Sequence, residues 1–323
     1  MPRPETASVS LRKDLSAVAN EFDASSAAAR FIGPLAAPRF NVPEQAGNYP
    51  ILNREDFRKP ANTARKDGAA YNRIEGQFAT GTWSCDEHGL EYVIDDRRRR
   101  RFASFIDAEQ AAARILRHQI LLAYERRVAA LYSGASLTAN KAATAWSTSA
   151  DGVPLSDLLT GMETLEDNCG TDRSQLSLII PRDAFREALA CAQVVDKIKY
   201  TYPGIQPALL APALFAAMLG IKGVLIASGS YDSTEEGYAE SIAQVWTAGY
   251  MYLALLADPD DPLEIPSAMR TMIWTADAAE IPIVESYRDE SRRGDVIRMR
   301  DDTDEVETAA ANLMAYELSA DAS

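Results

Sequence analysis

The sequence predicts an α+β protein whose front part is extended. Three patterns support this prediction: a helical pattern without Pro or Gly follows Asp107, short strand patterns with charged spacers fill residues 47–103, and helices alternate with apolar strands from about residue 150. The length of 323 residues suits about two domains or one elaborated domain. No internal repeat is found in the sequence.

Residues 1–46 are rich in Ala, Ser and Pro and predict an extended arm. The stretch S-L-R-K-D-L-S-A-V-A-N-E-F, from Ser10 to Phe22, is a short helical candidate because its apolar side chains recur at helical spacing. Pro34, Pro38 and Pro43 prevent this helix from continuing. Such an arm cannot bury a core of its own, so we expect its order to come from contact with neighbouring surfaces.

Residues 47–103 predict strands and turns rather than a compact domain. Short apolar or aromatic pieces are separated by charged spacers that contain Gly and Pro; they include Y-P-I-L, Q-F-A-T-G-T-W-S-C and L-E-Y-V-I. A long hairpin that protrudes from the body of a protein has this pattern. It would need a partner surface to be stable.

The clearest element is a helix that begins after Asp107. Gln110 follows three positions later, which resembles a capping box, and Gly134 supplies a C-terminal stop. Between them, apolar side chains recur every three or four residues, at Ala112, Leu116, Ile120, Tyr124, Val128 and Leu131. About 26 helical residues span about 40 Å. We therefore expect a structural spine.

The remainder of the chain alternates between helix and strand patterns. Helices are predicted at 154–165, 183–190 and 207–219, a strand at 174–181 and a buried strand at 224–227. The run A-Q-V-W-T-A-G-Y-M-Y-L-A-L-L predicts buried strands, although its Ala and Leu content leaves a helix possible. After the turn D-P-D-D-P, strands are predicted in R-T-M-I-W-T, I-P-I-V-E-S-Y and D-V-I-R-M-R, whereas A-N-L-M-A-Y-E-L fits either state.

The formal net charge of −14 is unevenly divided along the chain. Residues 1–150 hold 21 Lys and Arg against 17 Asp and Glu, whereas the remainder holds 12 against 30. This asymmetry suits a nucleic-acid face, complementary surfaces on identical neighbours, or an acidic surface that aids solubility. The three cysteines are widely spaced, which argues against a disulfide framework and fits a reducing compartment. The sequence has no 18-residue apolar run and no secretory signal.

A search for catalytic motifs finds little. The sequence has no G-x-S-x-G, no G-x-x-x-x-G-K-[ST] and no G-x-G-x-x-G. The stretch C-D-E-H, from Cys85 to His88, has zinc-like spacing without a second pair of ligands, and D-P-D-D-P at 258–262 lacks the Gly and Glu of a calcium loop. We expect His118 at a surface or interface and S-G-S-Y-D-S-T at 228–234 as a polar loop. The prediction is a structural protein rather than an enzyme, with no catalytic residue, metal site or cofactor.

Several stretches occur in an order that points to a known family. N-Y-P-I-L-N-R-E-D-F-R-K leads into the predicted loop, which holds W-S-C-D-E-H-G-L-E-Y-V-I-D-D, and D-A-E-Q-A-A-A-R-I-L begins the long helix. Q-V-V-D-K-I-K-Y and I-K-G-V-L-I-A-S-G-S-Y-D follow, and S-A-M-R-T-M-I-W-T and V-E-S-Y-R-D-E-S-R-R-G-D-V-I-R-M-R lie near the end. In this order they resemble the major capsid protein of tailed bacteriophages, which has the Hong Kong 97-type fold. The resemblance runs from about residue 37 to near the end of the chain.

The resemblance implies a division of the chain into five segments. These are an N-terminal arm at 1–46, an extended β-hairpin loop at 47–103, a peripheral domain with the spine helix at 104–145, an α/β axial domain at 146–265, and returning strands of the peripheral domain at 266–323. The implied function is that of a virion protein, assembled in the cytoplasm of a host bacterium. Its hexamers and pentamers would close into an icosahedral head around double-stranded DNA.

The implied partners follow from the same resemblance. They are other copies of the chain, a separate scaffolding protein, a portal, non-specifically contacted DNA and a possible decoration protein, with no membrane. Three other classes are considered. An encapsulin-like compartment has the same fold but holds protein cargo, and a metal-dependent hydrolase would use Cys85, His88 or Asp258. A sequence-specific DNA-binding protein disagrees with the acidic composition and with the lack of a groove-reading helix.

The stretch D-D-R-R-R-R-R-F, from Asp95 to Phe102, places five consecutive arginines in an acidic protein. It lies between the predicted loop and the helix that follows Asp107, at the base of the loop, where neighbouring subunits of such a shell meet. We predict that these arginines pair with acidic groups of an adjacent subunit and that Asp95 and Asp96 contribute to the same junction. The arginines are Arg97, Arg98, Arg99, Arg100 and Arg101. The alternatives are a solvated turn and contact with packaged DNA.

Overall fold

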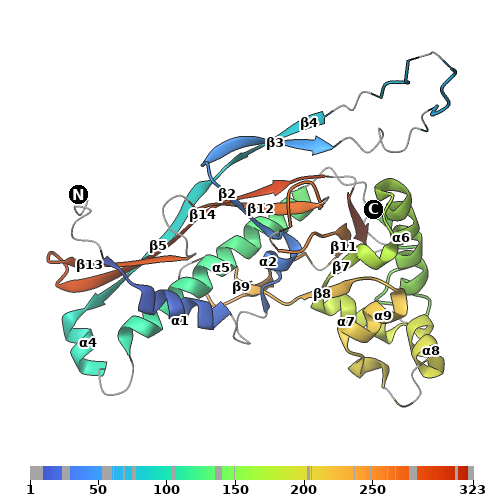
Figure 1. Ribbon diagram of the computed structural model, residues 1–323. Coiled ribbons are helices and arrows are strands. Elements are labelled where there is room, and N and C mark those ends of the chain that lie inside the picture. The colour runs from blue at the N-terminus through green and yellow to red at the C-terminus, as the bar shows by residue number, and fades with distance from the viewer. Residues whose placement is uncertain are drawn as a thin grey trace.

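The protein is built along one long helix, α5 (Ala108–Gly134), with a large sheet beside it, a helical region at one end and a projecting β-hairpin (Figure 1). The computed structural model describes residues 10–23, 30–52, 60, 62–67, 70–74, 78–102, 107–134, 140–148, 150–201, 204, 206–235, 237–247, 249–259, 261–265, 267–275, 282–309 and 312–318.

Helix α5 forms where the sequence predicts it. The Asp107 Oδ1 atom accepts hydrogen bonds from the backbone N–H groups of Glu109 (3.0 Å) and Gln110 (3.3 Å), which satisfies donors that a helix start otherwise leaves free. Gly134 is the last helical residue rather than the first residue beyond the helix. The predicted apolar face is buried at Ala112, Leu116, Ile120, Tyr124 and Val128, while Leu131 is only partly buried.

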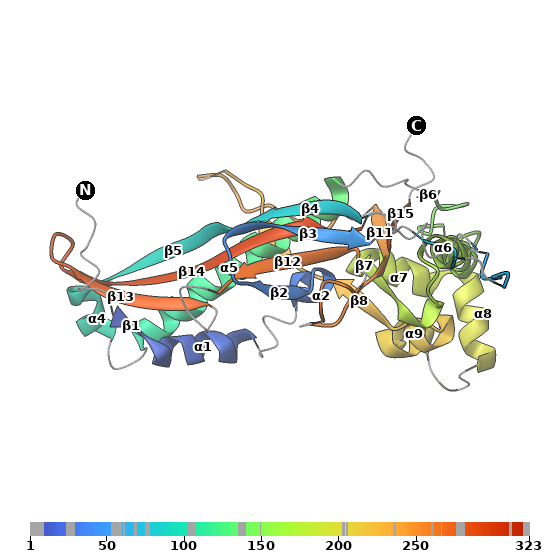
Figure 2. The same ribbon diagram turned by 45° about the horizontal axis from the view of Figure 1, so that its top comes forward.

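A six-stranded sheet covers one side of α5. The long strand β14 (Gly294–Glu307) holds it together, because β13 (Ile283–Asp289) and β12 (Met269–Trp274) pair with one edge of β14 and β5 (Asp86–Asp95) pairs with the other. The outer positions are taken by β1 (Ser10–Leu11) and β2 (Arg39–Val42). Apolar side chains of β5, β13 and β14 pack with α5 and with the arm helix α1 (Lys13–Asp23), so both helices lie on the same face of the sheet (Figure 2).

The other end of the molecule is an α/β layer around a five-stranded sheet. The strand order is β6 (Asn140–Lys141), β15 (Leu313–Glu317), β11 (Tyr250–Leu255), β7 (Leu176–Pro181) and β8 (Gly223–Ala227). Every residue of β7 is buried, which explains why its sequence, L-S-L-I-I-P, is apolar except at Ser177. The helices that pack in this region are α6 (Pro154–Cys169), α7 (Arg182–Ala190), α8 (Ala192–Thr201) and α9 (Pro212–Leu219), with short 3-10 turns at Arg173–Gln175 and Pro207–Leu209.

Two hairpins leave the body of the protein. The first consists of β3 (Ala46–Leu52) and β4 (Phe78–Ser84), which pair antiparallel over seven residues and project beyond the large sheet (Figure 1). The second consists of β9 (Ser230–Asp232) and β10 (Ile242–Gln244). The sequence predicts the first hairpin, whereas it predicts only a polar loop at 228–234.

The structure refines several other predictions. Residues 86–95, which the resemblance assigns to the extended loop, form β5 and pair with β14 over ten residues, so they lie within the large sheet. The arginine run forms helix α4 (Asp96–Phe102) rather than a turn. The predicted helix at 207–219 is interrupted before α9, and the segment that fits either state near the end is strand β15. The segment boundaries themselves stay predictions.

Candidate functional site

The arginine run lies in helix α4, which follows directly from β5. The Asp95 Oδ1 atom accepts hydrogen bonds from the backbone N–H groups of Arg97 (2.8 Å) and Arg98 (3.0 Å), so Asp95 caps the start of the helix. The backbone N–H of Asp96 donates to the carbonyl of Arg293 (3.1 Å) in the turn between β13 and β14. These contacts fix α4 at one end of the large sheet, far along the molecule from helices α6–α9 (Figure 1).

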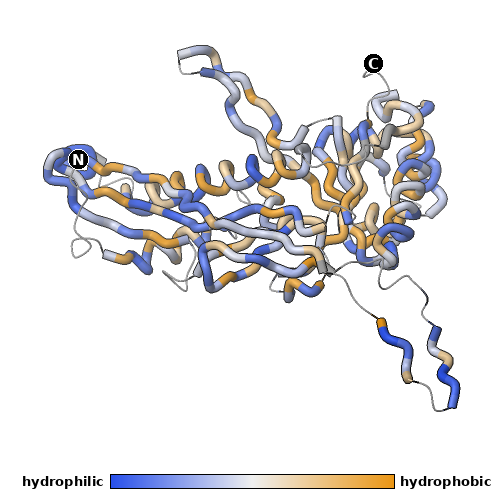
Figure 3. The backbone as a smooth tube through the Cα atoms, turned by 90° about the horizontal axis from the view of Figure 1, so that it is seen from above, coloured by the Kyte–Doolittle hydropathy of each residue, from blue (hydrophilic) through white to orange (hydrophobic). Residues whose placement is uncertain are grey.

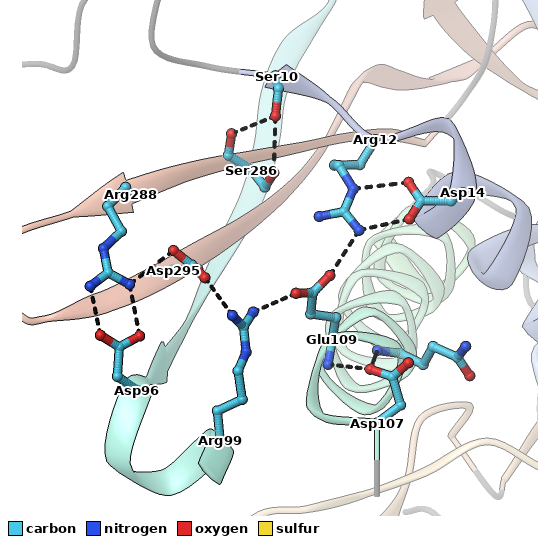
Figure 4. Close-up of polar contacts among 11 residues, drawn as sticks. Ser10, Arg12, Asp14, Asp96, Arg99, Asp107, Glu109, Ser286, Arg288 and Asp295 are labelled. Carbon is cyan, nitrogen blue, oxygen red and sulfur yellow. Dashed lines mark hydrogen bonds and ion pairs between the residues drawn. The ribbon is translucent and has the colours of Figure 1, made fainter. Parts of the chain in front are cut away.

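Helix α4 is also held by ion pairs within its own chain (Figure 4). The Arg99 guanidinium donates to the Glu109 carboxylate at the start of α5 and to Asp295 of β14 (2.7 Å). The Asp96 carboxylate accepts two hydrogen bonds from Arg288 of β13 (2.7 and 2.6 Å), and these hold the pKa of Asp96 below its ordinary value. Arg288 also reaches Asp295 (3.2 Å), so the pairs form one network.

The network continues into the N-terminal arm. Arg12 donates to Glu109 (2.8 Å) and makes two hydrogen bonds to Asp14 (2.9 and 2.7 Å), which lower the pKa of Asp14 to about 2. Charges therefore alternate from Asp96 through Arg288, Asp295, Arg99, Glu109 and Arg12 to Asp14 (Figure 4). This chain of ion pairs ties together the arm, α4, the β13–β14 pair and the start of α5.

The remaining arginines of α4 are exposed. Arg97, Arg98, Arg100 and Arg101 have no ion pair to any other residue that the structure describes. Arg292 and Arg293 lie in the adjacent β13–β14 turn and are exposed too. Hydrophilic residues gather at this end of the molecule (Figure 3). Four exposed guanidinium groups on one short helix create a positive potential at this end of the molecule.

The candidate residues predicted from the sequence thus divide into two groups. Asp95, Asp96 and Arg99 already have partners in their own chain, and their contacts position α4. The other four arginines point outward, and their predicted pairing with an adjacent subunit stays a prediction. The sequence pattern does not predict the helical state of α4 or the residues that hold it, because Arg288 and Asp295 lie more than 190 residues from their partners in the chain.

The residues considered for metal or catalytic roles take other positions. Cys85 is buried against the carbonyl of Met272, and burial raises the pKa of its thiol to about 11. His118 packs edge-on against the rings of Phe22 and Phe31 of the arm. Asp258 pairs with Lys222 (2.7 Å). In the described part of the chain, no three His, Cys, Asp or Glu side chains gather where they could hold a metal ion, and no helix there is long and apolar enough to cross a membrane.

Two buried charged residues of α5 fasten the arm, and the apolar pattern of the helix gives no sign of them. Arg117 is fully buried and donates to Asp23 of α1 (2.8 and 2.6 Å) and to Asp301 of β14 (3.1 Å). Glu125 is also fully buried, and burial raises its pKa. Its carboxylate accepts hydrogen bonds from the backbone N–H groups of Ile32 and Gly33 and from the Trp246 indole (2.6 Å). Both residues hold the arm through hydrogen bonds rather than apolar contacts. Because hydrogen bonds are directional, they specify where the arm lies on α5.

The base of the β3–β4 hairpin is fixed by aromatic rings that lie over glycines. A Cβ atom at Gly81 would lie 2.3 Å from the Tyr49 ring, and one at Gly47 would lie 2.4 Å from the Trp83 ring. Only glycine permits this approach, so each ring covers a glycine of the opposite strand. The Tyr49 hydroxyl donates to the Glu307 carbonyl (3.3 Å), and the Asp304 carboxylate accepts the N–H of Ser84 (2.8 Å). The hairpin therefore leaves the sheet from a firm base.

Comparisons with known structures assign the fold. No family model matches the chain. A crystal structure of a phage-related protein from Bordetella bronchiseptica matches 95% of this chain and 97% of its own with a TM-score of 0.71 at 19% identity. The capsid of the cyanophage P-SCSP1u matches 87% of this chain and 85% of its own with a TM-score of 0.57 at 9% identity. The chain has the Hong Kong 97-type fold of phage capsid subunits, as predicted.

A sequence comparison gives a more specific relative. The chain is 28% identical over 213 residues to a protein of Burkholderia phage BcepMu named "Major capsid protein". The match covers 64% of this chain, and it spans 65% of the length of that relative. The predicted resemblance to the major capsid proteins of tailed phages is thereby confirmed.

Proposed function

We propose that this protein is the major capsid protein of a tailed phage or prophage and that copies of it close through hexamers and pentamers into an icosahedral shell around double-stranded DNA. The observation that carries the proposal is the β3–β4 hairpin, whose base packs on the large sheet through Tyr49 and Trp83 while its strands project beyond the body of the protein. An isolated two-stranded hairpin is at best marginally stable in water. A neighbouring subunit is the surface that such an element needs.

The exposed residues support the same proposal. The arginine helix α4 presents four guanidinium groups at one end of a protein whose net charge is −14. Large apolar side chains are exposed elsewhere on the molecule, among them Tyr200 (81%), Tyr238 (77%) and Leu209 (75%). Subunits with obligate interfaces bury such groups against their neighbours. The relative named as a major capsid protein agrees with this function.

The role is structural, and the partners are those expected for a shell subunit. We propose other copies of the chain, a separate scaffolding protein, a portal, non-specifically contacted DNA and a possible decoration protein, with the protein located in the virion after assembly in a bacterial cytoplasm. Residues 1–46 would be the arm and the β3–β4 hairpin the extended loop. The large sheet with α5 would be the peripheral domain, and the five-stranded sheet with α6–α9 the axial domain.

Electron microscopy of the expressed chain tests the proposal. We expect closed shells, tubes or rings of capsomers in negative stain. Dispersed monomers under all salt conditions would overturn the assignment. Shells that enclose an enzyme through a docking peptide would identify an encapsulin-like compartment instead.

A further inference from the structure

The second hairpin, at residues 230–244, has properties that a polar loop does not need. Strands β9 and β10 pair in register from Ser230↔Gln244 to Asp232↔Ile242. Beyond them, the Asp232 carboxylate accepts the backbone N–H groups of Thr234 (3.0 Å) and Ser241 (3.1 Å), which lowers the pKa of Asp232. The Thr234 hydroxyl donates to the Ala239 carbonyl (3.0 Å). The hairpin is therefore braced by its own hydrogen bonds.

The root of this hairpin is fixed to the body. The Tyr231 ring lies under the Arg126 guanidinium of α5, 4.6 Å from its centre, and Gly229 lies against Phe31 of the arm. The Val245 N–H donates to the Gly229 carbonyl (3.0 Å). From this root the hairpin stands out from the molecule (Figure 2, pale orange). A stiff, anchored and projecting element is preorganised for contact with another molecule.

The outward surface of the hairpin is apolar and acidic. Side chains alternate along a strand, so Ile242 faces away from Tyr231 and from α5. Ile242 is 71% exposed and Tyr238, near the tip, is 77% exposed. Glu235 and Glu240 are exposed and form no ion pair within the described ranges. The sequence has eight Asp and Glu and no Lys or Arg from Gly223 to Met269.

Helix α4 carries the positive charge that complements this acidic hairpin. Arg97, Arg98, Arg100 and Arg101 of α4 are exposed, and a tyrosine ring is a favourable platform for a guanidinium group. The chain already uses that pairing between Arg126 and Tyr231. The two surfaces do not meet within one chain in this structure. The hairpin root lies at Arg126, which is 18 residues after Ala108 at the start of α5, or about 27 Å along the helix.

We propose that the hairpin at 230–244 docks on helix α4 of a second copy of this chain, with Glu235 and Glu240 near the exposed arginines and Tyr238 against a guanidinium group. The inference rests on the proposed self-assembly and names one of its contacts. A contact between two different surfaces is heterologous, so it passes from each subunit to the next and generates rings or continuing arrays. Charge complementarity across it selects the partner and the register.

Charge reversal with rescue tests the contact in the full-length chain. Reversal of the hairpin (Glu235→Arg with Glu240→Arg) or of the helix (Arg98→Glu with Arg101→Glu) should lower the yield of assembled particles about tenfold, which corresponds to about 1.4 kcal/mol. The chain with both reversals should recover most of that yield. Glu163→Arg on the exposed face of α6 is the control and should assemble like the parent chain. Recovery in the doubly reversed chain also shows that the single reversals did not act by unfolding.

The other outcomes are equally informative. Normal yield in both single reversals, or no recovery in the doubly reversed chain, overturns this contact while the parent particles still support the proposed function. Loss of packaged DNA with the helix reversal alone, at normal particle yield, identifies DNA as the partner of α4 and also overturns the contact. A parent chain that never assembles rejects the proposed function itself. As a second readout, Glu240→Cys with Arg101→Cys should give disulfide-linked multimers, because all three native cysteines are buried.

Discussion

Replacement of Arg117 by Met should release the N-terminal arm from the spine helix. Arg117 is fully buried and its guanidinium makes three hydrogen bonds, two to Asp23 and one to Asp301. Met fills a similar volume but leaves both carboxylates without their cation. The Asp301 side chain is only 10% exposed, so water cannot replace the lost partner, whereas that of Asp23 is 32% exposed and water compensates it in part.

The expected cost follows from this geometry. Removal of one member of a buried ion pair costs about 3–5 kcal/mol, and most of it here comes from Asp301. For a protein of this size, the melting temperature should fall by roughly 5–10 °C. The measurement is urea or thermal unfolding of unassembled subunits at one protein concentration, because assembly would add to the apparent stability. Trypsin should also cut the variant faster at Arg12 and Lys13, which flank the start of α1.

A matched variant separates this effect from a general loss of helix stability. Arg114→Met changes an exposed arginine of the same helix, one turn before Arg117, and should alter the unfolding free energy by less than about 0.5 kcal/mol. Equal stability of the two variants, with equal rates of cleavage in the arm, would refute the reasoning.

Three further changes test other parts of the structure. Gly81→Ala should displace the Tyr49 ring and speed proteolysis of the β3–β4 hairpin, whereas Gly134→Ala, whose Cβ meets no atom within 4 Å, should leave cleavage unchanged. Glu125→Gln sets an NH2 group against a backbone N–H and should cost about 1–3 kcal/mol, with a change in Trp246 fluorescence; unaltered stability and emission would contradict that role. Burial and the charges of Glu305 and Asp86 raise the pKa of Asp304 in the folded state. Above about pH 4 the unfolded chain loses this proton more readily than the folded protein, so the free energy of unfolding falls until the pH passes the raised pKa of Asp304. Asp304→Asn should therefore melt higher than the parent at pH 7 but not at about pH 4, and a constant difference across that range would exclude this effect.

Local sequence patterns predicted the elements whose formation depends on residues close to one another in the chain. The spacing of apolar residues and the cap at Asp107 were sufficient for α5, because helix geometry repeats within four residues. The stretch S-Q-L-S-L-I-I-P at 174–181, with four Leu and Ile residues in five positions, was sufficient to predict a strand where β7 forms. The resemblance to phage capsid proteins added the order of the elements, which the fold confirms.

The candidate site was predicted only in part. The arginine run is visible in the sequence, and so is its position before α5. Its helical state and the choice of Arg99 as the inward-facing arginine were not predictable, because they depend on Asp295 and Glu109, which lie 196 and 10 residues away. The hairpin at 230–244 was missed as well. The sequence does mark this hairpin as acidic, because it lies in the stretch from Gly223 to Met269, which contains no Lys or Arg.

The sequence by itself determined the spine helix, the extended front part, the alternating domain and the uneven charge, since each follows from the spacing or composition of neighbouring residues. The tertiary structure alone decided which charges are balanced within the chain and which remain free. Ion pairs such as Arg117–Asp301 and Arg288–Asp96 join residues from different elements, and their formation depends on how sheet and helix pack. The packing of sheet and helix leaves four arginines of α4 exposed, without an ion pair to the described residues, and it holds the root of the acidic hairpin in place.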